Sequence, residues 1–237
     1  FYASSILALA SVIVLIGMKE TLKDRESFKP RLLKIKSVDI LEPRVYSSSF
    51  VLMLNVFAFG VILTVIPDLT VHLGLTNKGV FFAIFTITSL MIRIFAGQAS
   101  DRYGRVPLLK IASVIIITSL ILISLSDNLM MFYIAAGLYG VGVGISTPTA
   151  YAWTIDLSEE KHRGRALATM FIALETGIGG GALISAWIYN NNANNFPITF
   201  LMSASMSALA LIYLFYYSIR HKRISAIKVP VLEERKK

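Results

Sequence analysis

The chain has 237 residues, of which 55% are hydrophobic and 16% are charged. The hydrophobic share exceeds the roughly 45–50% of a soluble globular domain, so we exclude an ordinary soluble fold. The formal net charge is +9. The Lys and Arg residues nevertheless lie in short patches between apolar blocks, a distribution that argues against nucleic acid as a partner.

The sequence offers few residues that bind metals or act as nucleophiles. No cysteine is present, which excludes disulfides, thiolate metal ligands and cysteine nucleophiles. The three histidines, His72, His162 and His221, fall in expected loops or at helix ends. We therefore expect neither a metal site nor a cofactor.

The chain begins with an apolar run over residues 1–18, which it enters without an initiator Met or a positively charged leader segment. We therefore expect the chain to start inside a transmembrane helix. A polar, strongly basic stretch follows over residues 19–45 and predicts a long loop.

Six further apolar runs follow, each close to the roughly 20 residues that cross a bilayer as a helix. They are continuously apolar, whereas the strands of a membrane barrel alternate over about 10 residues. The sequence therefore predicts an all-α polytopic membrane protein with seven helices, six of which form a bundle over residues 46–219. These six occupy residues 46–67, 79–99, 108–126, 129–155, 166–189 and 196–219, and a basic tail covers residues 220–237.

The distribution of positive charge predicts the orientation of the chain. All of the 23 Lys and Arg residues except Lys78 and Arg93 fall in alternate loops, in the linker or in the tail. Cytoplasmic segments carry this excess. We expect a multi-pass protein of the cell's inner membrane, with Phe1 outside and Lys237 and the basic loops in the cytoplasm.

A short motif lies between the third and fourth expected helices, where residues 97–105 read GQASDRYGR. It resembles the loop motif G-x-x-x-D-R-x-G-R of major facilitator superfamily permeases. Residues 163–166 (RGRA) are similar to the pattern that opens the family's eleventh helix, and residues 175–181 (ETGIGGG) resemble its Gly-rich stretch in the drug and sugar efflux branches. The position of the first motif makes this chain similar to family helices six to twelve.

Each residue of the motif has a physical use. Gly97 permits close approach of a neighbouring helix, Asp101 accepts charge-assisted hydrogen bonds, and Gly104 supplies a tight turn. Arg102 and Arg105 hold the segment at the cytosolic face. Together they predict a conformational latch between helices.

The resemblance implies a fold and a function. The fold is the C-terminal six-helix bundle of the family, preceded at residues 1–18 by the last helix of the N-terminal half and at 19–45 by the cytoplasmic linker. The function is secondary active transport of a small drug-like or sugar-like solute by alternating access, with proton-coupled efflux expected. The partners are then the substrate, a proton or other coupling ion, the lipid bilayer and a missing N-terminal half.

Glu175 is the acidic residue deepest within an expected helix. An ionised carboxylate at the bilayer centre costs about 2.5–3.5 kcal/mol on insertion scales, so we expect it to face the protein interior. We interpret Glu175 as a site for a proton or a cationic substrate group. The alternative is a protonated acid that hydrogen-bonds a neighbouring helix.

Other polar residues are candidates for the transport path. Arg93 either braces the motif through Asp101 or Asp156, or binds an anion or carboxylate. Asn55 is a cavity candidate with Phe59, or an interhelical hydrogen-bonding residue. Tyr139 lines the path or lies at the membrane interface, where we also expect Trp153 and Trp187. Four residues at spacings of three and four predict an inward stripe on the third helix: Phe82, Thr86, Ser89 and Arg93.

Glycines concentrate on the helix of residues 129–155, at Gly137, Gly140, Gly142 and Gly144. Small residues at such spacings either let helices pack closely or let them bend. The pattern alone does not separate these two uses.

Three other functions compete with a two-half transporter. A retinal-type receptor or light sensor needs a lysine in its last helix, and residues 196–219 contain none. A membrane enzyme needs a catalytic pair or cluster at membrane depth, and none is evident, so we expect no enzyme activity. A half-size transporter working as a homodimer is the third alternative.

Overall fold

The computed structural model describes the backbone of residues 5–6, 8–12 and 41–234, and the side chains as far as Arg220. Residues 5–6 and 8–12 are helical and belong to a unit of their own, Phe1–Lys36. The rest of the first expected span and the basic linker as far as residue 40 lie outside the described residues. Both therefore stay predictions.

Residues 41–234 form six long helices, all of them long and apolar enough to cross a membrane. Every element described in this part of the chain is helical, which confirms the predicted fold class. The helices are α3 (Tyr46–His72), α4 (Val80–Tyr103), α5 (Arg105–Ser124), α6 (Leu129–Leu157), α7 (Arg163–Tyr189) and α8 (Phe196–Glu234). Short 3-10 turns η2 (Pro43–Val45), η3 (Glu160–His162) and η4 (Ala193–Asn195) precede α3, α7 and α8.

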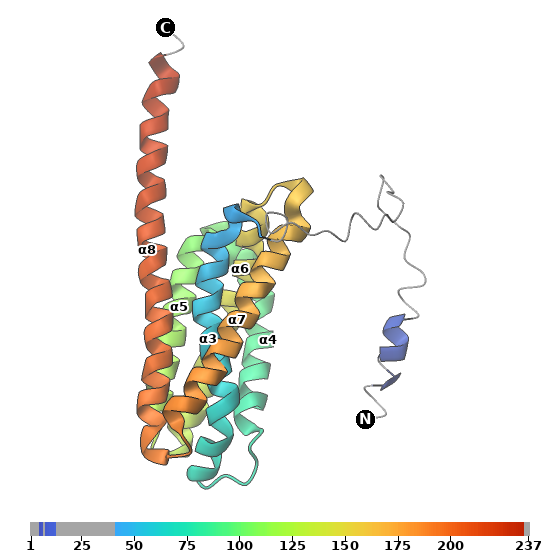
Figure 1. The fold of residues 1–237 in the computed structure, drawn as a ribbon, viewed down its shortest axis with the longest axis vertical. Coiled ribbons are helices and arrows are strands. Elements are labelled where there is room, and N and C mark those ends of the chain that lie inside the picture. Colours follow the sequence, from blue (N-terminus) through green and yellow to red (C-terminus); the bar gives the residue numbers. More distant parts are fainter. Residues whose placement is uncertain (1–4, 7, 13–40, 235–237) are drawn as a thin grey trace. The chain divides into compact units, whose positions relative to one another are not determined.

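Two helices run further than their apolar patterns predict. α3 passes through Pro67 and ends at His72. A membrane helix tolerates the loss of the one backbone hydrogen bond that a proline cannot donate. α8 continues as a helix to Glu234 through the residues expected to form a basic tail. Figure 1 shows α8 running on past the ends of α3, α5 and α6.

The motif at residues 97–105 is helical over most of its length, which corrects the expectation of a loop. α4 continues through Tyr103, and Gly104 alone separates it from α5. Gly104 has a φ of +90°, which side-chain-bearing residues rarely adopt, and its N–H donates to the Ser100 carbonyl oxygen at 3.1 Å. The turn expected of this glycine is therefore made by one residue.

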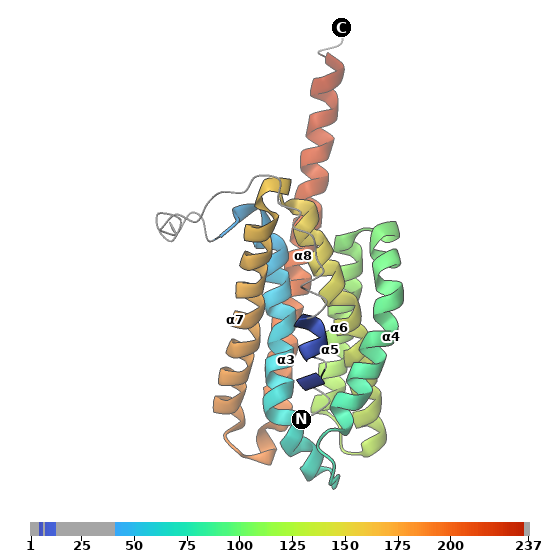
Figure 2. The same cartoon turned by 90° about the vertical axis from the view of Figure 1, so that its right-hand side faces the viewer.

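The helices pack as two interleaved triplets, α3–α5 and α6–α8. α3 packs chiefly against α7 and α8, α6 packs chiefly against α4 and α5, and α5 also contacts α8. The pattern of contacts stays the same when α3, α4 and α5 are exchanged with α6, α7 and α8. Because each triplet crosses the membrane three times, the second triplet starts on the opposite side of the membrane from the first. The bundle is thus an inverted repeat, and α7 and α4 lie at its two outer edges in Figure 2.

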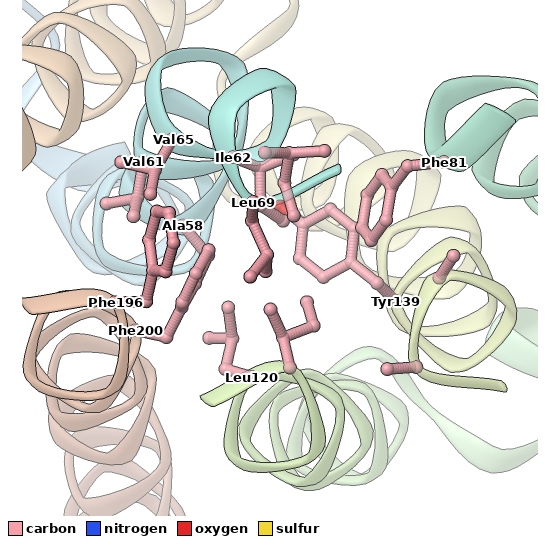
Figure 3. Packing of buried hydrophobic residues seen from close by; sticks show 14 of the residues in the cluster. Ala58, Val61, Ile62, Val65, Leu69, Phe81, Leu120, Tyr139, Phe196 and Phe200 are labelled. Carbon is pink, nitrogen blue, oxygen red and sulfur yellow. The ribbon is translucent and has the colours of Figure 1, made fainter. Parts of the chain in front are cut away.

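The main core cluster gathers side chains from all six long helices, with Tyr189 as the contribution of α7. Figure 3 shows Ala58 and Ile62 of α3 among Phe200 of α8, Leu120 of α5 and Tyr139 of α6. By contrast, α4 and α7 are poorly covered, since only 17% and 22% of their most apolar segments are buried, against 67% for α3. Two helices of the bundle therefore carry wide faces that contact nothing within residues 41–220.

Glycines bring the helix pairs into close contact. A Cβ on Gly181 would lie 2.1 Å from the Phe57 carbonyl oxygen, and one on Gly177 would lie 2.4 Å from that of Met53, so α7 and α3 touch through their backbones. Three glycines pack α6 equally closely against α4 or α5: Gly140, Gly142 and Gly144. Close packing therefore explains these three residues. Gly97 has nothing within 4 Å of its Cβ position among the described residues, so the close approach expected there stays a prediction.

The two tryptophans occupy different environments. Trp153 is 4% exposed and meets the Tyr217 ring edge-to-face, with centroids 5.1 Å apart. It belongs to the core, which corrects its expected place at the membrane interface, because the neighbouring α8 covers it. Trp187 is 83% exposed, as an interfacial side chain requires.

Candidate functional site

A cavity of about 270 Å³ lies among five of the six long helices and is lined by both triplets. It brings together four of the residues that the sequence singled out for transport, namely Asn55, Phe59, Arg93 and Tyr139. The other lining residues are Val56, Phe85, Ile116, Val143, Ser146, Thr147, Leu174 and Ile178.

One wall of the cavity is aromatic. The Phe59 and Phe85 rings have centroids 5.9 Å apart, and the Phe85 and Tyr139 rings have centroids 5.5 Å apart. These three side chains come from α3, α4 and α6, so the wall spans the junction of the two triplets. Such a surface accepts flat apolar groups.

Asn55 both lines the cavity and links two helices. Its side chain is buried, at 2% exposure, and its Nδ2 donates to Ser113 Oγ of α5 at 3.0 Å. The amide oxygen lies 3.4 Å from the same hydroxyl. The two roles left open for Asn55 are therefore compatible in one side chain.

Two buried hydroxyls of the cavity have no hydrogen-bond partner among the described residues, Tyr139 Oη and Ser146 Oγ. Tyr139 is fully buried and Ser146 is 3% exposed. Several other buried hydroxyls of the bundle donate to a carbonyl of their own helix, as Thr149 does to Ile145 at 2.7 Å, and Ser49, Ser203 and Ser207, away from the cavity, also lack a partner among the described residues. A buried hydroxyl without a partner costs free energy. The hydroxyls of Tyr139 and Ser146 are therefore free to hydrogen-bond a molecule bound in the cavity.

Arg93 is the single charged residue among those lining the cavity. It stands ten residues before the end of α4, four residues before the motif begins at Gly97, and its side chain is exposed. Within the described residues it makes no ion pair. The carboxylates of Asp101 and Asp156, its expected partners, are bound instead by Arg105.

Two other candidates lie outside the cavity. Ser89 is buried where α4 touches Gly144 of α6, so it serves helix packing in this structure. Glu175 is exposed on α7, on a face that contacts no other helix in residues 41–220, so the interior position expected for it stays a prediction.

Arg105 joins the motif to α6 at the end of the bundle. Its Nη1 donates to Ser100 Oγ at 2.8 Å and to Asp101 Oδ1 at 2.5 Å, and its Nε donates to Asp156 Oδ2 at 2.8 Å. Arg102 takes no part in this network: its guanidinium lies over the Tyr103 ring, 5.6 Å from the centroid. Arg105 is therefore the residue that joins the motif to α6, and the conformational role expected of the motif stays a prediction.

A second ionic cluster lies at the same end. Arg165 of α7 donates hydrogen bonds from Nε (2.9 Å) and from Nη2 to Glu42 Oε2, and the Glu42 N–H donates to Thr169 Oγ1 at 2.8 Å. The hydrogen bonds from Arg165 lower the pKa of Glu42, and in the same way Arg44 lowers the pKa of Glu159. The segment before α3 is thus fastened to the start of α7.

Sequence reasoning missed several residues of both sites. Phe85 falls three residues after Phe82 and four before Ser89, so helical spacing was an available signal for it. Ser146 and Thr147 resemble many other small polar residues of the spans, and nothing local distinguishes them. The pair of Glu42 and Arg165 is 123 residues apart, and no local pattern indicates it.

Comparison with known proteins identifies the group to which the fold belongs. Residues 48–233 match the model of the Major Facilitator Superfamily. The chain is 30% identical over 140 residues to multidrug resistance protein 2 of Bacillus subtilis (strain 168), covering 56% of this chain and 35% of that protein. It is 29% identical over 154 residues to the staphylopine export protein of Staphylococcus aureus (strain Mu50 / ATCC 700699), covering 63% and 38%.

A solved structure shares the fold. The crystal structure of a D-xylose–proton symporter aligns with a TM-score of 0.61 and 16% identity, covering 79% of this chain and 53% of that one. The chain spans less than half of the two curated relatives described above. With the family model matching most of its length, this integral membrane protein belongs to the major facilitator superfamily.

Proposed function

We propose that this chain forms the substrate-binding half of a secondary transporter that moves a small solute across the bilayer by alternating access. The observation that carries the proposal is the cavity between the two inverted triplets, which combines an aromatic wall with a charge and unpartnered hydroxyls. Transporters of this architecture bind substrate near the midplane, between repeats. The place of Arg93 near the middle of α4, 14th of its 24 residues, supports such a site.

A second six-helix half completes the transporter in this proposal. The poorly buried faces of α4 and α7 need a protein partner, since they carry Arg93 and Glu175 at membrane depth, where contact with lipid is costly. The relatives, more than twice as long as the aligned region, support the presence of such a half. The two faces would then border a central path.

We propose export as the direction of transport and a proton as the coupling ion. The names of the multidrug resistance and staphylopine export proteins support export. Glu175 lies near the middle of α7, where a carboxyl group facing a water-filled path can take up and release a proton during the cycle. The basic ends of the helices support a cytoplasmic location for the motif and for the start of α7.

Flux measurements test the proposal. The complete natural polypeptide that contains residues 1–237 is reconstituted in liposomes, and substrate flux is followed with and without an imposed pH gradient. We expect gradient-driven flux in the wild type and its loss in Glu175→Gln, with the matched variant Glu160→Gln unaffected because that acid is exposed at the membrane end. Undiminished pH-dependent flux in Glu175→Gln would eliminate the coupling role, and no flux of any tested solute would eliminate transport.

A further inference from the structure

We propose that the cavity selects organic anions, specifically small solutes that join a carboxylate or similar anionic group to a flat apolar part. This inference rests on the proposed function and names its substrate class. It is carried by the charge and the hydrogen-bonding groups of the cavity lining, taken together.

The lining carries one positive charge and no negative charge. Arg93 is the single charged group among the residues that line the cavity, and no acidic residue lines it. Asp101 and Asp156 are held by Arg105, and no ion pair joins Arg93 to Glu175 within residues 41–220. A guanidinium at membrane depth needs a counter-ion, and an anionic substrate supplies one.

The hydrogen-bonding groups of the lining also suit an anion. Besides the five N–H groups of Arg93, the hydroxyls of Tyr139 and Ser146 are buried and have no partner among the described side chains. A carboxylate only accepts hydrogen bonds and can engage several such donors at once. A cation would need acceptors instead, and the lining offers it no carboxylate.

The aromatic wall determines which apolar group the substrate carries beside its anionic group. The adjoining rings of Phe59, Phe85 and Tyr139, tilted by 35° in each pair, form an apolar surface beside the charged group. Aromatic faces also attract cations, but Arg93 lines the same small cavity and repels them. The arrangement therefore favours a solute with an aromatic or similarly flat body and a single anionic head.

A set of matched probes tests this inference. Naphthalene carboxylate, the uncharged naphthalene carboxamide and a naphthyl trimethylammonium cation share one aromatic body and differ in charge. Equilibrium binding of each radiolabelled probe is measured on the purified complete polypeptide, and flux of each is measured in liposomes. We expect the carboxylate to bind about ten- to hundredfold more tightly than the amide, as a charge-assisted hydrogen bond supports.

Variants locate the preference. Arg93→Gln should abolish the preference for the carboxylate: it should weaken carboxylate binding about ten- to hundredfold and leave amide binding unchanged. Arg93→Lys should retain part of the preference. Arg163→Gln is the matched control, because that arginine is half-exposed at the start of α7 and pairs with Glu160. Its carboxylate affinity should equal that of the wild type.

The outcomes separate this inference from the proposed function. Tighter carboxylate binding that depends on Arg93 upholds the inference whether or not flux is seen. Binding without flux of any probe counts against transport alone. Flux or binding of the amide or the cation at least equal to that of the carboxylate overturns the anion preference and leaves transport standing. A carboxylate preference that survives in Arg93→Gln, or an absence of binding by all three probes, also overturns it.

Discussion

At the scale of single residues, the separation of α3 and α7 is set by glycines that leave no room for a methyl group. Gly181 faces the carbonyl oxygen of Phe57, and Gly177 faces that of Met53. Backbone atoms cannot rotate away as a flexible side chain can. Gly179, on the same helix, has open space where a Cβ would stand.

Alanine substitution at these two kinds of position should have opposite effects on stability. Gly181→Ala should destabilise the fold by about 1–3 kcal/mol, because the added methyl group forces the helices apart. Gly179→Ala should stabilise it by roughly 0.5–1 kcal/mol, because alanine restricts the unfolded chain. Unfolding midpoints in detergent measure both, and equal shifts in the two variants would contradict the packing described for α3 and α7.

The sequence identified important residues more readily than it identified their contacts. The sequence indicated that Arg93 was significant, because an arginine within an apolar run is rare. Its partner was misassigned because Arg105, whose side chain reaches Asp101 and Asp156 across a one-residue turn, competes for the same acids. Trp153 was misplaced for a similar reason, since its burial depends on α8, which is distant in sequence.

At the scale of elements, the positions of six helices were predictable and their ends were less so. Apolar runs located α3 to α8 because the bilayer demands about 20 apolar residues for each span. They missed the extension of α4 through Tyr103, because the polar residues of the motif are as compatible with a helix end outside the membrane as with a loop. The cavity was out of reach, because it depends on how five helices are arranged.

The motif and α6 are joined by an ion pair whose strength is measurable. Asp156 is half-exposed, with 50% of its side chain accessible, and solvent screens such pairs. A double-mutant cycle of Arg105→Gln and Asp156→Asn should give a coupling energy of about 0.5–1 kcal/mol in unfolding measurements. The same cycle with Arg102→Gln should give a value near zero, and coupling of equal size there would contradict the central place of Arg105.

The fastening of η2 to α7 should depend on pH. Arg165 lowers the pKa of Glu42 below its ordinary value of 4.5. The stabilising contribution of Glu42 is therefore complete above that value and is lost as the pH falls below it through the folded-state pKa. Melting temperatures between pH 7 and pH 3 should fall less steeply in Glu42→Gln than in the wild type. Glu160→Gln, which removes a carboxylate that is 85% exposed, should retain the wild-type slope.

At the scale of the whole molecule, the six spans place alternate connections on opposite sides of the membrane. The chain has no cysteine, so an introduced cysteine is unique within these 237 residues. Ser158→Cys lies between α6 and α7, and Asn191→Cys lies between α7 and α8. An impermeant maleimide should label position 191 in intact cells and position 158 only after permeabilisation. Labelling of both in intact cells would refute the orientation.

The interleaving of the triplets has a consequence for how the chain is made. α3 and α4 find their main partners, α7 and α6, in the second triplet. During synthesis α3, α4 and α5 therefore enter the lipid before α6 and α7 have been made. The surfaces of α3 and α4 that pack closely against those helices stay uncovered until then. A polypeptide that ends at residue 128 would contain α3, α4 and α5, which contact one another little. It would therefore not form a stable bundle. Completion of the second triplet is thus the step that turns inserted helices into a cavity.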